Sequence, residues 1–175
     1  MTLAPDPLLA ADLTAAAHLT GRFVLRSGAV SSEYFDKFRF ESDPALLRRI
    51  AQRMLALIPA DTQVLAGLEL GGVPIATAMS LESGLPAVFV RKAAKAYGTC
   101  RAVEGADVTG RTLAIVEDVI STGGAIVEGA AHLRAEGGVI GGVVCAVWRG
   151  QGSPAIQALP DVPVRAAFLQ TELKS

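Results

Sequence analysis

The sequence has little of what several classes of protein are built from. Its two cysteines, Cys100 and Cys145, are too few for a disulfide framework or a structural zinc site. The 16 basic and 17 acidic side chains give a formal net charge of -1. Nothing in this balance draws the protein toward nucleic acid or an anionic membrane. We therefore expect no nucleic-acid or membrane partner, and any anion that binds has to be held by a local site.

Long hydrophobic runs and targeting signals are also missing. Every apolar run is too short or too often interrupted to span a bilayer. The first 12 residues contain Asp6 and two prolines and lack a basic start, so they do not have the pattern of a signal peptide. Together with the sparse cysteines, this predicts a cytoplasmic protein.

What is present fits one globular domain. The chain has 175 residues, of which 51% are hydrophobic and 19% charged, and this composition excludes disorder. A chain of this length can bury about two thirds of its unfolded surface in one core. We expect a single domain over residues 1–175.

The N-terminal part, about residues 1–42, is predicted to form a helix and a small hood. Asp6 can cap a helix over residues 8–19. Residues 23–40 mix aromatics, charges and a Ser-Gly turn, which is typical of a ribbon or hairpin at the edge of a domain. Apolar residues at three- and four-residue steps predict a second helix over residues 43–59.

From residue 64 onward, predicted strands and helices alternate. The predicted strands are residues 64–68, 86–90, 112–116, 139–148 and 162–169, with helices at 74–84 and 125–136. This alternation predicts an α/β fold with a largely parallel central sheet flanked by helices. In such sheets, ligands bind where the carboxyl ends of the strands meet the following loops.

One connection, residues 91–110, is unusually long. It contains Arg91, Lys92, Lys95 and Arg101 and has almost no apolar periodicity. A loop of that length in a compact domain is typically a functional lid or a disordered segment. We expect a long flexible loop whose cations meet an anionic ligand, and a solvated basic surface is the alternative.

The most informative stretch follows the strand at 112–116. Two carboxylates, Glu117 and Asp118, precede Ser121, Thr122 and a Gly-Gly pair at a helix start. Free N–H groups and the helix dipole favour a phosphate at such a turn, and the hydroxyls add donors. The carboxylates can accept hydrogen bonds from sugar hydroxyls or hold a hydrated divalent cation. A phosphate and a diol together indicate a phosphorylated sugar.

Simpler interpretations of this stretch stay open. Asp118 can act only as a helix cap, and the glycines can serve only to make a tight turn. The stretch is neither a Walker loop nor a dinucleotide fingerprint, because the glycine and lysine spacings of both are absent.

The stretch resembles the signature with which type I phosphoribosyltransferases bind phosphoribosyl pyrophosphate: a strand, two acidic residues and a loop rich in Thr, Ser and Gly. Further segments resemble the orotate phosphoribosyltransferases within that group, and the likeness runs from about Leu19 to Arg149. These segments are residues 23–28 with Ser31, Tyr34 and Phe35, residues 67–76, and residues 91–98.

The resemblance implies the type I phosphoribosyltransferase fold and transfer of a 5-phosphoribosyl group to orotate in pyrimidine biosynthesis. It implies catalytic roles for Lys92, Lys95 and Asp118. The residues implied to bind phosphoribosyl pyrophosphate come from three segments: a glycine turn at residues 69–72, the basic loop 91–110, and the acidic stretch that starts at residue 117. They are Glu69, Leu70, Gly71, Arg91, Lys92, Lys95, Tyr97, Glu117, Asp118, Val119, Ile120, Ser121, Thr122, Gly123, Gly124 and Ala125.

Orotate carries a carboxylate, so its pocket needs a cation, and Arg26 and Arg149 are the candidates. The resemblance places Tyr34 and Phe35 along the base pocket and Ser121 within contact of the base. Core packing of the aromatic pair and a surface position for Arg149 are the alternatives.

Three positions depart from common family residues. Tyr97 replaces a frequent histidine, Gly71 stands where many relatives have a lysine, and Arg26 replaces a lysine. Tyr97 can donate a hydrogen bond but is not a cation near neutral pH, so weaker binding of pyrophosphate by the loop is expected.

The resemblance also implies Mg²⁺ that is carried by pyrophosphate, with no direct protein ligand and at most a water-mediated contact to Asp118. It further implies a homodimer in which the loop 91–110 is shared between subunits. Two rival functions stay open: a phosphoribosyltransferase for a purine or uracil, and a regulatory domain that binds nucleic acid or a partner. We expect Cys145 in the core, Cys100 in the loop, and His18 and His132 on helices without a catalytic role.

Overall fold

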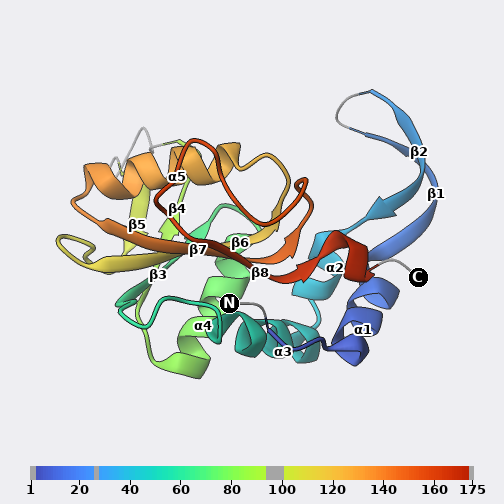
Figure 1. Cartoon of the computed structure of the whole chain (residues 1–175), viewed down its shortest axis with the longest axis horizontal. Helices are drawn as coiled ribbons and strands as arrows, with labels where there is room; N and C mark the ends of the chain where they lie inside the picture. Colours follow the sequence, from blue (N-terminus) through green and yellow to red (C-terminus); the bar gives the residue numbers. More distant parts are fainter. Residues whose placement is uncertain (1–2, 26–27, 94–100, 174–175) are drawn as a thin grey trace.

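The computed structural model describes residues 3–25, 28–93 and 101–173. Figure 1 shows one sheet with helices on both faces and a hairpin that projects from the body. The elements run α1 (Pro7–Ala17), β1 (His18–Val24), β2 (Val30–Phe35), α2 (Lys37–Glu41), α3 (Pro44–Leu55), β3 (Val64–Leu68), α4 (Gly72–Ser83), β4 (Ala87–Val90), β5 (Val103–Gly105), β6 (Thr112–Ile120), α5 (Gly124–Ala135), β7 (Val139–Trp148), β8 (Val164–Leu169) and the 3-10 helix η1 (Gln170–Leu173). The predicted α/β fold is confirmed.

The central sheet has the strand order β5-β4-β3-β6-β7-β8, and only β5 pairs antiparallel to its neighbour. From the adjacent pair β3 and β6, the chain proceeds to β4 on one side and to β7 and β8 on the other. This pair is therefore the topological switch point, where open α/β sheets form their ligand crevice. The loops that follow β3 and β6 begin at that crevice.

Two hydrophobic layers hold the sheet between helices. Helices α3 and α4 cover one face and α5 covers the other (Figure 1). All five residues of β3 are buried, which explains why that strand is a continuous apolar run in the sequence. The bounds of β3 and β7 are those that the sequence predicts.

The N-terminal hood consists of the antiparallel pair β1 and β2 and the short helix α2. The rings of Phe23 and Tyr34 stack across the hairpin with their centroids 5.4 Å apart. The predicted first helix is two residues too long, because His18 and Leu19 already pair with β2. His18 therefore lies on a strand, not on a helix as predicted.

Several other predicted boundaries also shift. Residues 37–41, expected in the ribbon, form α2, and the helix expected to reach residue 59 ends at Leu55. Part of the long connection, Val103–Gly105, is the edge strand β5, which a three-residue run could not reveal. Strand β6 extends through Ile120, so both carboxylates lie within the strand. Among the described residues, none of the helices is both long enough and apolar enough to span a membrane.

Candidate functional site

The helices that start at the switch point differ from the N-terminal helices in how they begin. Asp6, Asp36 and Asp43 cap α1, α2 and α3 through side-chain hydrogen bonds to backbone amides. The N-caps of α4 and α5 are Gly71 and Gly123, which make no side-chain cap. Both helices thus begin without a side-chain cap at the crevice, where the positive end of a helix dipole favours an anion.

The turn after β3 approaches the sheet so closely that it requires glycine. A Cβ at Gly72 would lie 2.3 Å from the carbonyl oxygen of Val116, and one at Gly67 would lie 2.6 Å from the carbonyl oxygen of Gly72. Helix α4 therefore starts directly against β6. Glu69, at the start of the turn, accepts a hydrogen bond from the backbone amide of Lys92 at 3.2 Å, and its peptide bond to Leu70 is cis.

Asp118 does not cap α5, so that interpretation of the sequence is wrong. Its side chain is 1% exposed, and its Oδ2 lies 2.6 Å from Nζ of Lys37 at the start of α2. Its Oδ1 accepts a hydrogen bond from the amide of Val119. A Cβ at Gly71 would lie 1.5 Å from Asp118 Oδ2, so the carboxylate fills the space beside the glycine turn.

Two further carboxyl groups, on Glu117 and Glu41, surround this ion pair. Burial and then the hydrogen bond and charge of Asp118 raise the pKa of both. For Lys37, burial lowers the pKa, but the hydrogen bond to Asp118 and the nearby carboxylates outweigh it, so the pKa is raised. Lys37 is therefore a cation and Asp118 its ionic partner. Sequence reasoning missed Lys37 and Glu41, because no local pattern links α2 to β6.

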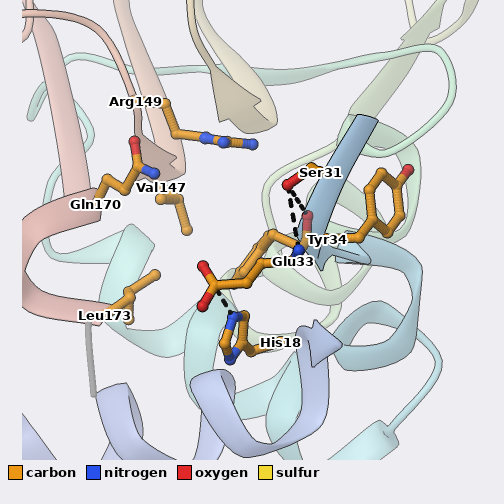
Figure 2. Close-up of a pocket in the computed structure, with 9 residues that line it drawn as sticks. His18, Ser31, Glu33, Tyr34, Val147, Arg149, Gln170 and Leu173 are labelled. Atoms are coloured by element: carbon orange, nitrogen blue, oxygen red, sulfur yellow. Dashed lines mark hydrogen bonds and ion pairs between the residues drawn. The ribbon is translucent and has the colours of Figure 1, made fainter. Parts of the chain in front are cut away.

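A cavity of about 420 Å³ lies between the hood and the ends of β7 and η1. Figure 2 shows Arg149 and Gln170 on one side of it, and Ser31 and Tyr34 of the hood opposite. The cavity brings together three of the residues predicted to bind a base, Tyr34, Phe35 and Arg149.

Other groups lining this cavity were not predicted. His18 Nε2 lies 3.6 Å from Glu33 Oε2, across the β1–β2 hairpin (Figure 2). Phe35 also packs against the core through Phe40, so the core-packing alternative holds for part of that ring. The alternation of side chains along a two-residue period could have indicated that His18 and Glu33 share a face, had β1 been predicted to start there.

The remaining predicted residues lie around the crevice or outside the described residues. Arg91, Lys92, Ser121, Thr122 and Gly124 are exposed, and Val119 and Ile120 complete β6. Ala125 belongs to the first turn of α5. Arg26, Lys95, Tyr97 and Cys100 lie outside the described residues. Cys145 is buried in the core, as predicted, and burial raises the pKa of its thiol. His132 lies on α5, as predicted.

Comparison with known proteins assigns the chain to a family. The Phosphoribosyl transferase domain matches residues 40–164. An orotate phosphoribosyltransferase from Nocardioides sp. is 50% identical over 173 residues, which cover 99% of this chain and 96% of that protein. The chain belongs to the orotate phosphoribosyltransferase family.

Other orotate phosphoribosyltransferases agree with this assignment. The protein of that name from Methanocella arvoryzae is 43% identical over 87% of each chain. A crystal structure of the orotate phosphoribosyltransferase from Mycobacterium tuberculosis, in complex with Fe(III) dicitrate, superposes with a TM-score of 0.85 at 31% identity and covers 97% of this chain and 98% of that one. Another structure of the M. tuberculosis enzyme, with phosphoribosyl pyrophosphate bound, has a TM-score of 0.78 at 26% identity and covers 95% and 97%.

Proposed function

We propose that this protein transfers the 5-phosphoribosyl group of phosphoribosyl pyrophosphate to orotate, giving orotidine 5'-monophosphate and pyrophosphate. The observation that carries the proposal is the pair of uncapped helix N-termini, at Gly71 and Gly123, that flank the Asp118 carboxylate at the switch point. Two anion sites around one diol acceptor match a sugar that carries phosphate at both ends.

The ribosyl donor is bound between these turns. The amides at the start of α5, with Ser121 and Thr122, bind the 5'-phosphate, and the turn at Glu69–Gly71 faces pyrophosphate. Glu117 and Asp118 accept hydrogen bonds from the ribose hydroxyls. No covalent nucleophile is required, because catalysis consists of positioning both substrates and stabilising the charge that leaves.

The acceptor occupies the cavity that Arg149 lines. The guanidinium of Arg149 can hold the orotate carboxylate through two parallel hydrogen bonds. Tyr34 and Phe35 cover the pyrimidine ring, and Ser121 and Arg26 complete its contacts. The ring nitrogen then attacks the anomeric carbon as the bond to pyrophosphate breaks, through a transition state with oxocarbenium character.

The cations of the segment 91–110 act on the leaving group. Arg91 and Lys92 follow the carboxyl end of β4. The backbone amide of Lys92 donates a hydrogen bond to Glu69, which places both residues beside the glycine turn. Lys92 and Lys95 neutralise pyrophosphate as it departs, and Tyr97 donates a hydrogen bond. We propose that two copies of the chain form a homodimer in which this segment serves the neighbouring site and excludes water from it.

Magnesium is the proposed cofactor. Within the described residues, no group of three or more acidic, histidine or cysteine side chains could hold a metal ion. Asp118 already pairs with Lys37, so we propose that it does not bind the ion directly. The pyrophosphate would carry the ion, and a water molecule would link the ion to Asp118. When bound, the ion neutralises phosphate charge. We further propose a cytoplasmic enzyme with no nucleic-acid or membrane partner.

Two rival functions predict different chemistry. A phosphoribosyltransferase for a purine or uracil has a neutral acceptor, for which Arg149 in the cavity offers no counter-charge. A regulatory domain that binds nucleic acid requires a basic face, whereas the formal net charge of this chain is -1.

A spectrophotometric assay of orotate loss tests the proposal. Purified protein with phosphoribosyl pyrophosphate and Mg²⁺ is expected to consume orotate and release one pyrophosphate per orotidine 5'-monophosphate. Omitting Mg²⁺ with a chelator present is expected to abolish turnover. Turnover of adenine, hypoxanthine or uracil without turnover of orotate contradicts the proposed acceptor.

A further inference from the structure

Lys37 belongs to the hood and yet reaches into the centre of the sugar-phosphate site. It is the first residue of α2, and Asp36 before it caps that helix. Its Nζ lies 2.6 Å from Asp118 Oδ2, and the two side chains are 35% and 1% exposed. A buried carboxylate needs a cation or hydrogen-bond donors to hold it in place. The contact with Lys37 therefore fixes the orientation of Asp118.

The glycine turn adds a steric side to this contact. A Cβ at Gly71 would meet not only Oδ2 of Asp118 but also its Cγ at 2.3 Å and its Cβ at 3.0 Å. The side chain of Asp118 thus fills the place that a residue larger than glycine would need at position 71. Gly71 gives the carboxylate its space, and Lys37 supplies the cation from a different part of the chain.

The bonding of Asp118 leaves it able to act on a ligand. One oxygen accepts from the Val119 amide and the other pairs with Lys37. Each carboxylate oxygen has two lone pairs, and the carboxyl groups of Glu41 and Glu117 also hydrogen-bond to Asp118. Sugar hydroxyls can therefore bind this carboxylate where they take the place of one of these carboxyl groups, while Lys37 keeps it in position.

We propose that Lys37 is a positioning residue for phosphoribosyl transfer, which holds the Asp118 carboxylate beside the Gly71 turn so that the ribose hydroxyls meet an oriented acceptor. This inference rests on the proposed function. It also assigns the hood to both substrates. The β1–β2 hairpin lines the proposed orotate cavity, and α2, which follows it directly, carries Lys37 to the ribose site.

The test compares Lys37→Met, which keeps the length of the side chain and removes its charge, with Lys37→Arg. We expect Lys37→Met to raise the KM for phosphoribosyl pyrophosphate at least about tenfold, while the KM for orotate changes less than threefold. Lys37→Arg is expected to recover most of the donor affinity. Arg49→Met is the matched control, because Arg49 pairs with Asp12 at the same 2.6 Å but lies on the exposed surface of α3.

Calorimetric titration with the donor plus Mg²⁺ separates this inference from the proposed function. If the wild-type protein binds the donor but does not consume orotate, orotate is not the acceptor and the proposed function is wrong. The inference about Lys37 can still be tested in that case, because it is measured as the difference in donor affinity between Lys37→Met and wild type. Donor affinity of Lys37→Met within twofold of wild type overturns the inference, as does an equal loss for both substrates.

Removing Lys37 alone leaves several carboxyl groups without their cation, which can prevent folding. In that case Lys37→Met is combined with Glu41→Gln, and Glu41→Gln alone becomes the reference protein. The same loss of at least about tenfold in donor affinity is expected between these two. Equal donor affinities of the two variants overturn the inference.

Discussion

The backbone amide of Arg149 donates a hydrogen bond to the carbonyl of Ile120 at 2.8 Å. This bond joins the end of β7 to the end of β6, immediately before the loop that starts at Ser121. The cation that lines the proposed orotate cavity is therefore fixed next to the proposed 5'-phosphate loop. Two substrates held in adjacent sites by one rigid sheet edge gain the orientation that a displacement reaction needs.

Replacing Arg149 by methionine is expected to act on orotate alone. A charge-assisted contact is worth about 1.5 to 3 kcal/mol, so the KM for orotate should rise roughly 10- to 150-fold. The KM for phosphoribosyl pyrophosphate should change less than threefold. Steady-state kinetics with each substrate varied in turn make the measurement, and Arg134→Met, on the exposed part of α5, is the control. A rise in the donor KM alone contradicts the placement of Arg149.

Replacing Gly71 by alanine is expected to act on the ribosyl donor. The new Cβ would lie 1.5 Å from Asp118 Oδ2, so the carboxylate has to move from its place beside Lys37. We expect the KM for the donor to rise at least about tenfold and the KM for orotate to change little. Kinetics run alongside a thermal unfolding scan distinguish this local effect from loss of the fold. A donor KM within twofold of wild type in a folded variant would show that the carboxylate is not needed there.

Lys95→Ala is expected to lower turnover by at least about tenfold, which corresponds to about 1.4 kcal/mol of transition-state stabilisation. The physical reason is the loss of a cation that neutralises departing pyrophosphate. Single-turnover measurement of orotidine 5'-monophosphate formation reports this step, with Arg134→Ala as the control. An unchanged rate removes Lys95 from the mechanism.

The stability of the protein is expected to fall as pH rises above about 5. Burial, then Asp118, raises the pKa of Glu41 from 4.5 to about 9, so between these values the folded state holds a proton that the unfolded state has lost. Unfolding in this window releases that proton, so a rising pH favours the unfolded state and the free energy of unfolding declines between about pH 5 and pH 9.

Denaturant unfolding at pH 6 and pH 8 measures this decline. In Glu41→Gln, which cannot titrate, the decline should be smaller, and what is left comes from Glu117, whose pKa is also raised by burial and by Asp118. Glu128→Gln, on the exposed surface of α5, is the control and should keep the full decline. Equal slopes in Glu41→Gln and wild type would contradict the assignment.

Much of the site was predictable because its parts are local. The acidic pair, the hydroxyls and the two glycines lie within eight consecutive residues, 117–124, so a short stretch of sequence shows them together. The apolar runs of β3 and β7 gave their bounds directly, since strands buried on both faces need hydrophobic residues throughout. The sequence prediction ended β6 at residue 116, because charged residues ordinarily follow the end of a buried strand. In the structure β6 continues through Ile120, with both carboxylates inside it.

The sequence by itself determined the fold class, and it predicted a phosphate loop over residues 121–124. Only the tertiary structure decided that Lys37 pairs with Asp118 and that Gly71 makes room for this carboxylate. The shared cavity of Arg149 and Tyr34 was expected from the family resemblance alone, not from any local pattern. Periodicity and turn chemistry act between near neighbours in the chain, so they leave a mark in the sequence. Contacts between α2 and β6, or between β2 and β7, form only when the sheet assembles and the hood folds against its edge, and no local pattern records them.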